Sequence, residues 1–307
     1  MRGLQFGLAV AVAFGLNLSS RAQDTKPAEK KEIAWAKSYK DALEQSRKTG
    51  KLIMVDFYTD WCGWCKVLDK ETYTSVPVKD VADKSFISLK INAEKEGVAL
   101  NKRYAINGYP TILFLDGSKA PDAGKEDGKA GEGEVAGKIV GFMPGEPFAD
   151  KMTAIDAANK EFPNLVARVD KDGSDLEALG KLAVAYHDRG NPKKAEETLK
   201  QADQLDAKNA KGLLTKAYNA VGDDYQEAQD FNKAIALFRK AAETGGKDVN
   251  AVVYALQSLA SCYMSQGKAA QAQAELESVL KLEGLSKGDR DQTMQLLEQI
   301  KQSAKGR

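Results

Sequence analysis

The chain has 307 residues, which is enough for two ordinary domains. Hydrophobic residues make up 43% and charged residues 29%, proportions that are typical of folded globular protein rather than of a disordered chain. Lys and Arg total 45 against 44 Asp and Glu, so there is no excess of positive charge to attract nucleic acid. We therefore expect no nucleic-acid partner.

Residues 1–22 have the pattern of a signal peptide. Arg2 supplies the positive start, residues 4–18 are mostly apolar and uncharged, and Ser20-Arg21-Ala22 places small residues before a cleavage site. The apolar stretch is shorter than the ~20 residues of a spanning helix, which favours cleavage over an uncleaved anchor. The sequence predicts a periplasmic or secreted protein without stable membrane insertion, beginning with a flexible leader over residues 23–32.

Residues 33–160 are predicted to alternate helices and strands, as an α/β domain does. The expected helices cover residues 33–50, a short segment that begins at the cysteine motif, 98–104 and 146–158; the expected strands cover 52–58, 86–92, 111–115 and 138–142. Residues 117–134 are dense in Gly and charged residues, a composition that predicts a loop.

Residues 161–307 are predicted to form an all-α domain, because apolar residues there recur at helical spacing. Leu179, Leu182, Ala183 and Tyr186 are followed by Ala195 and Leu199, and the same spacing returns at Leu256, Leu259, Ala260, Tyr263, Ala272 and Leu276. This pattern resembles the tetratricopeptide repeat, with Gly190 and Gly267 at the turns within helix pairs. Between them, Ala234 follows a poorly matching segment, which predicts an irregular middle repeat. A generic helical bundle is the alternative.

The chain contains three cysteines, of which Cys62 and Cys65 form a Cys-x-x-Cys motif directly after an apolar strand. If a helix begins there, its free N–H groups and the positive end of its dipole favour a thiolate. We therefore expect Cys62 to be an accessible nucleophile with a lowered pKa. Cys65, more buried, is placed to resolve the mixed disulfide, so the pair forms a redox disulfide.

Two further features accompany the motif. Asp56 lies within the apolar strand, where a buried carboxylate is costly unless it serves a purpose such as accepting the proton of Cys65. Lys90, in the next strand, is a candidate to share that proton or to pair with Asp56. Tyr109-Pro110 precedes the third strand, and a cis bond there would expose backbone for pairing with an extended substrate.

Together these residues resemble the thioredoxin superfamily, closest to the exported branch that includes the C-terminal domain of the bacterial transmembrane disulfide reductase. The resemblance covers about residues 33–160 and implies a thioredoxin fold of four or five strands with a cis Pro110 beside the thiols. The catalytic candidates are Cys62, Cys65, Asp56 and Lys90; the candidates for substrate contact are Trp61, Gly63, Trp64, Tyr109 and Pro110.

Trp64 stands where thioredoxin has a proline, a position that tunes the redox potential, so the motif leaves the direction of exchange open. We favour a reductase or isomerase over an oxidase, acting on protein disulfides with electrons from a partner thiol protein and with no cofactor. The repeats are expected to dock a client or another protein partner.

Two other functions compete with this one. In the first, the repeats form an interaction scaffold and the cysteines only a structural disulfide. In the second, both thiolates carry a soft metal such as Cu(I) or Zn(II). A resident zinc site is not expected, since His187 is the only histidine and its helical position suggests a surface residue. Cys262 is expected to be a buried, inert thiol.

Overall fold

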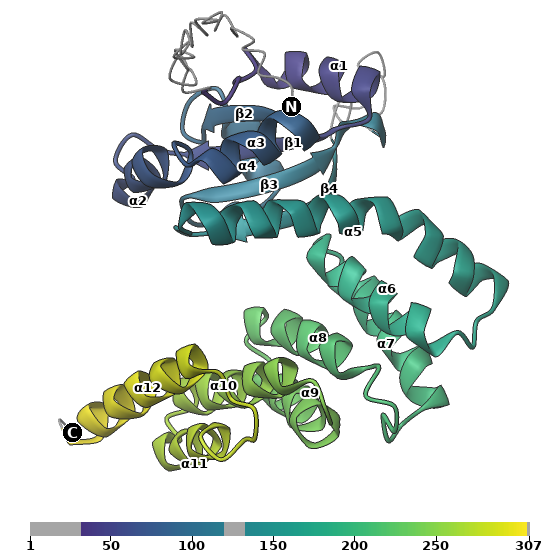
Figure 1. The fold of residues 1–307 in the computed structure, drawn as a ribbon, viewed down its shortest axis with the longest axis vertical. Coiled ribbons are helices and arrows are strands. Elements are labelled where there is room, and N and C mark those ends of the chain that lie inside the picture. Colours follow the sequence, from purple (N-terminus) through teal and green to yellow (C-terminus); the bar gives the residue numbers. More distant parts are fainter. Residues whose placement is uncertain (1–31, 120–132, 306–307) are drawn as a thin grey trace, which may run out of the picture. The chain divides into compact units, whose positions relative to one another are not determined.

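The computed structural model describes residues 32–119 and 133–305. The predicted signal peptide, nearly all of the leader and residues 120–132 of the predicted loop lie outside this part. The first half contains α1 (Tyr39–Thr49), β1 (Leu52–Tyr58), α2 (Gly63–Val67), the π-helical segment η1 (Leu68–Thr72), α3 (Val76–Ser85), β2 (Phe86–Asn92), α4 (Val98–Arg103), β3 (Thr111–Asp116), the 3-10 turn η2 (Gly117–Lys119), β4 (Glu134–Val140) and α5 (Gly145–Lys171) (Figure 1).

The four strands form one sheet in the order β2-β1-β3-β4. β1 runs parallel to β2 and antiparallel to β3, and β4 is antiparallel to β3. The parallel pair is joined by the crossover α2-η1-α3, because parallel strands cannot be linked by a tight turn. This is the α/β arrangement that the sequence predicts.

The central strand β1 has helices over both of its faces. Leu52 and Met54 belong to a core cluster that also holds residues of α3 and α5, whereas Ile53, Val55 and Phe57 pack with α1. Because successive side chains of a strand point to opposite faces, Asp56 lies on the same face as Leu52 and Met54. A carboxyl group therefore occupies a position within the apolar core of the α3 and α5 side.

The prediction that the first helix begins at Ile33 is wrong for the residues before Tyr39. α1 begins at Tyr39, where the hydroxyl of Ser38 accepts a hydrogen bond from the Asp41 N–H at 3.2 Å and caps the helix. Trp35 is instead extended and pairs in parallel with Ser88 of β2. Its ring packs edge-on against Tyr73, so the aromatic spacing that suggested a helix reflects a core contact of an extended segment.

Two other elements differ from their predicted bounds. The strand expected over 138–142 begins earlier, at Glu134, and ends at Val140, because Gly141 turns the chain with a φ of +81°. α5 continues past the expected end at residue 158 to Lys171. Its first half packs on the sheet through Phe148 and Met152, and its second half packs against α6 through Phe162 and Leu165.

The second half of the described chain is helical. It contains α6 (Leu176–Asp188), α7 (Pro192–Leu205), α8 (Thr215–Glu227), α9 (Phe231–Thr244), α10 (Val249–Ser265), α11 (Ala269–Val279) and α12 (Lys287–Lys305) (Figure 1). The helices pair as α6 with α7, α8 with α9, and α10 with α11. Small residues at Ala195, Ala234 and Ala272 are fully buried, which lets the paired helices approach closely.

The turns inside the three helix pairs share one geometry. A backbone hydrogen bond of 2.8–2.9 Å closes each turn and runs to the carbonyl of a tyrosine, Tyr186, Tyr225 or Tyr263. Gly190 and Gly267 have positive φ values at this turn, as the repeat pattern predicts, but the middle pair has Gln229 there with a φ of +60°. The middle repeat therefore keeps the fold without the glycine that marks it in sequence.

The connection before the middle pair, residues 206–214, is longer than the connection after it, residues 245–248. Asn209 is buried within it, accepts a hydrogen bond from the Leu214 N–H and donates to the hydroxyls of Thr215 and Thr244. These bonds fix the connection as an ordered turn, because a buried amide must have partners. Among the residues that the structure describes, no helix is both long enough and apolar enough to cross a membrane.

The Gln229 turn gives a stability prediction. We expect Gln229→Gly to raise the free energy of unfolding by about 1 kcal/mol, because a left-handed conformation is costly for a residue with a Cβ atom. Urea unfolding of the full chain measures this. The matched control is Gly267→Ala, whose φ of +72° and open surroundings leave backbone strain as the main cost, so it should destabilise by a similar amount. A Gln229→Gly variant less stable than the wild type would contradict the argument that the left-handed backbone of Gln229 costs stability.

Candidate active site

The cysteine motif lies where the central strand passes into a helix. β1 ends at Tyr58, a short turn follows, and Cys62 is the N-cap residue of α2. The Cys65 N–H donates to the Sγ of Cys62 at 3.0 Å, and the two sulfurs form a disulfide. The first sulfur thus accepts a hydrogen bond from the free N–H groups of the helix, an arrangement that favours negative charge on it.

The expectation that Cys62 is accessible and Cys65 more buried does not hold in the disulfide form. The exposed fractions of Cys62 and Cys65 are 4% and 3%. Nothing lies within 4 Å of the position that a Cβ atom would take at Gly63. The motif is therefore open to solvent beside the sulfurs, although the sulfurs themselves are covered.

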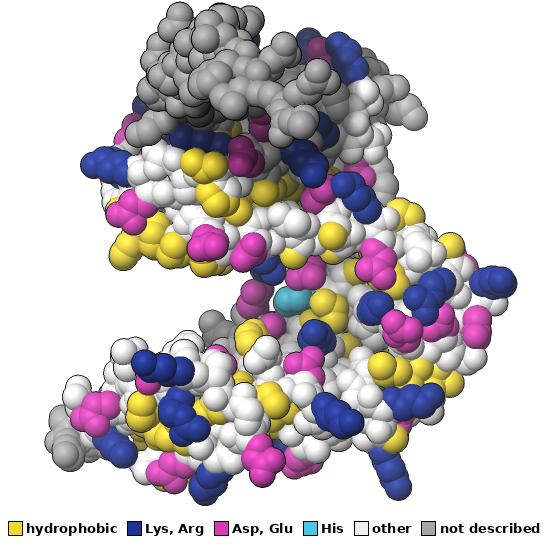
Figure 2. Space-filling model, viewed as in Figure 1, with side chains coloured by type: hydrophobic (Ala, Val, Ile, Leu, Met, Phe, Trp, Pro, Cys, Tyr) yellow, Lys and Arg dark blue, Asp and Glu magenta, His cyan; other side chains and the backbone are white. Residues whose placement is uncertain are grey.

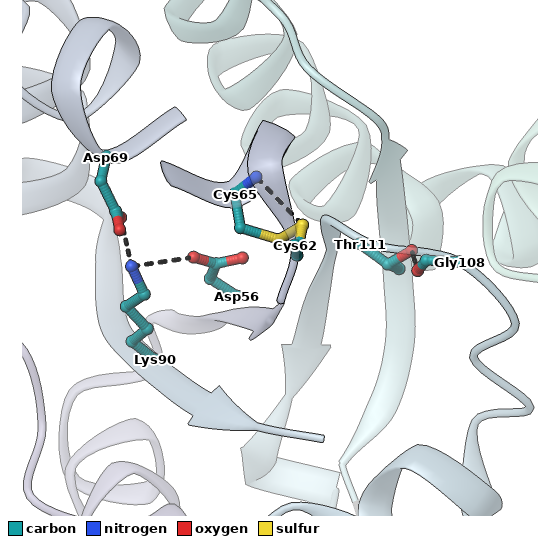
Figure 3. The surroundings of a disulfide bond; sticks show 7 residues. All are labelled: Asp56, Cys62, Cys65, Asp69, Lys90, Gly108 and Thr111. Carbon is teal, nitrogen blue, oxygen red and sulfur yellow. Dashed lines mark hydrogen bonds and ion pairs between the residues drawn. A yellow bond between two sulfur atoms is a disulfide. The ribbon is translucent and has the colours of Figure 1, made fainter. Parts of the chain in front are cut away.

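Asp56 lies beneath the motif and is completely buried. Burial raises the pKa of its carboxyl to about 7, although the positive charge of Lys90 acts in the opposite direction. Lys90 stands directly opposite Asp56 in the β1–β2 register, with its Nζ 3.8 Å from the Asp56 Oδ2. Figure 3 shows the Asp56 carboxyl between Lys90 and the disulfide, so two of the predicted site residues meet there.

Sequence reasoning missed two neighbours of this pair. Lys90 donates to the carboxylate of Asp69, which lies on η1 and is half-exposed (Figure 3). Tyr73 follows η1, is buried in the same cluster as Leu52 and Met54, and has its ring 6.0 Å from the Lys90 Nζ. Asp69 stands four residues after Cys65, about one helical turn, and residues at this spacing lie on the same face of a helix. This spacing is the sequence signal from which Asp69 could have been predicted as a site residue.

Trp61 and Trp64 flank the disulfide and, with the rings that they contact, form what we call the aromatic collar. Both are more than half exposed, at 66% and 60%. Trp61 packs edge-on against Tyr109 with ring centroids 5.9 Å apart, and Trp64 stacks on Phe142 at 5.7 Å. The collar therefore includes Phe142, which the sequence did not single out, and its exposed rings offer an apolar surface to another chain.

The loop before β3 joins the site through Tyr109. The Tyr109–Pro110 peptide bond is cis, as the resemblance implies, and Pro110 is buried. The hydroxyl of Thr111 donates to the Gly108 carbonyl at 2.8 Å, and both residues lie near the disulfide in Figure 3. The structure thus brings Trp61, Tyr109 and the Pro110 loop together; their contact with a substrate stays a prediction.

Cys262 and His187, which we did not expect to belong to the site, both lie in the helical part of the chain. Cys262 is buried, as predicted, and burial raises the pKa of its thiol to about 11. His187 lines a surface groove, as its predicted surface position implies, but its side chain is only 17% exposed and its Nδ1 lies 2.8 Å from an Asp224 oxygen. Burial lowers the pKa of His187, but Asp224 together with the nearby Asp188 and Asp223 outweighs burial and leaves the pKa above its ordinary value. No group of three or more metal-binding side chains occurs within residues 32–119 and 133–305.

The raised pKa of Asp56 predicts a pH-dependent stability. Between pH values of about 4 and 7 the folded chain holds a proton on Asp56 that the unfolded chain releases, so this carboxyl lowers the free energy of unfolding as pH rises, by something on the order of 4 kcal/mol. Asp56→Asn abolishes this titration. We expect the oxidised variant to match the wild type near pH 4 and to exceed its stability at pH 8 in urea unfolding. An equal difference at both pH values would contradict the raised pKa.

Comparison with known proteins supports this description. A family model of thioredoxin-like domains matches residues 34–117, and a model of the tetratricopeptide repeat matches residues 176–209 and 253–284. Over 137 residues the chain is 31% identical to the thiol:disulfide interchange protein DsbD of Vibrio cholerae, covering 43% of this chain and 20% of that protein. Over 113 residues it is 36% identical to DsbD of Escherichia coli, covering 36% of this chain and 18% of that protein.

The chain thus spans about a fifth of the length of these curated relatives. Among solved structures, a thioredoxin from Thermus thermophilus is similar with a TM-score of 0.35 and 23% identity, over 43% of this chain and 92% of that one. Neither repeat match includes the middle helix pair, where Gln229 replaces the glycine. Residues 34–117 are therefore a thioredoxin-like domain, and residues 176–209 and 253–284 are tetratricopeptide repeats.

Proposed function

We propose that this protein is an exported thiol–disulfide oxidoreductase that acts on the disulfides of other proteins. The observation that carries the proposal is the Cys62–Cys65 disulfide at the N-cap of α2, directly above the buried Asp56 and its partner Lys90. A purely structural disulfide needs neither a buried carboxyl beneath it nor exposed tryptophans on either side. The similarity of this half to part of two thiol:disulfide interchange proteins supports the same function.

In the proposed reaction the reduced protein begins with a Cys62 thiolate. This sulfur attacks a client disulfide, forms a mixed disulfide and releases one client thiolate, which takes a proton from solvent. Asp56 then accepts the proton of the Cys65 thiol, and the Cys65 sulfur attacks Cys62. The second client thiolate leaves, so the client is reduced by two electrons and Cys62–Cys65 is oxidised.

The direction and the compartment belong to the same proposal. We favour reduction or isomerisation over oxidation, with a thiol protein returning electrons to Cys62–Cys65. The signal-peptide pattern of residues 1–22 supports export to the periplasm or secretion. An oxidising compartment is where client disulfides persist.

The repeats are proposed to hold the client or a partner protein. Helices α6, α8 and α10 contribute His187, Asp223 and Tyr254 to a groove of about 730 Å³, which Lys138 of β4 also lines. Figure 2 shows charged side chains of both signs over the helical part of this face. A polar groove beside the thioredoxin-like domain supports docking of a polypeptide whose disulfide then reaches Cys62.

The function is tested by the reduction of insulin disulfides with dithiothreitol as the electron source. We expect the wild type to accelerate the reaction, and Cys62→Ser and Cys65→Ser to fall to the rate without protein, because each lacks one of the two sulfurs. When dithiothreitol is removed before insulin is added, reduced Cys65→Ser should accumulate an insulin adduct through Cys62 that reducing agent releases. Cys262→Ala is the matched control and should retain the wild-type rate, since that thiol is buried away from the site.

Two outcomes would overturn the proposal. Wild-type protein that does not accelerate reduction would favour the interaction scaffold, with the cysteines as a structural disulfide. A stoichiometric Cu(I) or Zn(II) in the purified reduced protein, lost in Cys62→Ser, would favour the soft-metal carrier.

A further inference from the structure

Beneath the disulfide, a tyrosine hydroxyl and a carboxyl share one buried site. The hydroxyl of Tyr73 and both carboxyl oxygens of Asp56 are inaccessible to solvent, and none of the three makes a hydrogen bond. Buried polar atoms without partners are uncommon and costly in folded proteins. Two such groups in one place therefore call for an explanation that the Asp56–Lys90 pair alone does not provide.

The fold directs both groups to the same face of the sheet. Asp56 points to the α3 and α5 side by the alternation of β1, and Tyr73 belongs to the core cluster on that side. The Tyr73 ring is held edge-on by Trp35 at 5.2 Å and by Phe148 at 5.9 Å. Its backbone N–H donates to the Leu68 carbonyl, which fixes the residue at the end of η1.

Three groups lie around Asp56, and two of them are charged. Lys90 of β2 lies 3.8 Å away, Asp69 of η1 pairs with Lys90, and the disulfide-bonded Cys65 of α2 stands above. The Tyr73 hydroxyl is close enough to lower the pKa of Asp56, against the larger effect of burial. Burial in turn raises the pKa of Tyr73 well above its ordinary value, so the hydroxyl keeps its proton and remains a donor.

We propose that Tyr73 is a positioning residue for the proposed disulfide exchange: in the reduced protein its hydroxyl donates to ionised Asp56 a hydrogen bond that is not formed in the disulfide form, and so holds the carboxylate ready to accept the proton of Cys65. This inference rests on the proposed function and adds a residue to it. In the step concerned, the Cys65 S–H bond breaks and its proton moves to Asp56. The new thiolate forms a bond to Cys62 Sγ, and the bond from Cys62 to the client sulfur breaks, with the electron pair leaving on the client thiolate.

Tyr73→Phe tests the inference because it removes only the hydroxyl and keeps the packed ring. The resolution step is observed with an aromatic disulfide whose thiolate product is coloured: the first thiolate reports attack by Cys62, and the second reports resolution by Cys65. Without the Tyr73 hydroxyl the ionised form of Asp56 is less stable, so the pKa of Asp56 rises. The pH below which the rate of the second phase falls should therefore move up by about half to one unit. The first phase should keep its pH profile.

In carbon NMR of the reduced protein, the Asp56 carboxyl should titrate at a higher pH in Tyr73→Phe than in the wild type, by the same shift as the second phase. Tyr39→Phe is the control, since that tyrosine contacts Tyr104 on the other side of the sheet. In an Asp56→Asn background, Tyr73→Phe should leave the second phase unchanged, because the group on which it acts is gone.

Superimposable second-phase profiles and Asp56 titrations for wild type and Tyr73→Phe would overturn the inference. So would a Tyr73→Phe effect of equal size in the Asp56→Asn background, which is what a merely structural role predicts. If the wild type released no second thiolate at all, the proposed function itself would fail, and that result is distinct from either of these.

Discussion

The site depends on the junction between the central strand β1 and helix α2, where Cys62 is the N-cap residue. The first N–H groups of a helix have no partner within it, and here one of them binds the Cys62 sulfur at 3.0 Å. Six of the seven residues of β1 are buried, so the strand holds that junction in place from below. The same strand carries Asp56 under the cysteines, which means that one element positions both the sulfurs and the carboxyl.

The remaining elements fix the surroundings of that junction. β2 supplies Lys90 in register with Asp56, and the π-helical segment η1 returns the chain so that Asp69 meets Lys90 and Tyr73 enters the core. The Pro110 loop and Phe142 complete the aromatic collar through Tyr109 and Trp64. Helix α5 then links this half to the repeats, since it packs on the sheet with one half and on α6 with the other.

The sequence predicted well the features that local patterns determine. Apolar runs located β1, β2 and β3, and the Asp56–Lys90 pair followed from the two strands being neighbours. It failed where tertiary contacts decide the outcome. Trp35 is extended because it pairs with β2, and His187 is half-buried because Asp224, on another helix, binds its ring. Tyr73 was missed because its place in the core depends on how η1 returns the chain, which no residue pattern reveals, whereas Asp69 could have been found from its spacing of four residues after Cys65. The middle repeat was predicted, but only as an irregular one, and its turn forms with Gln229 where the other two have glycine.

The most direct test of this account is the rate at which each thiol of the reduced protein is alkylated by iodoacetamide across pH, resolved by mass spectrometry of the labelled peptides. Since the helix N-terminus favours a thiolate at Cys62, that sulfur should react faster than Cys65 at every pH. Its rate should rise with pH to a plateau, and the midpoint of the rise should lie below the pKa of about 8.5 of an ordinary cysteine. Equal rates for the two thiols, or a Cys62 that ionises like a free cysteine, would contradict the account.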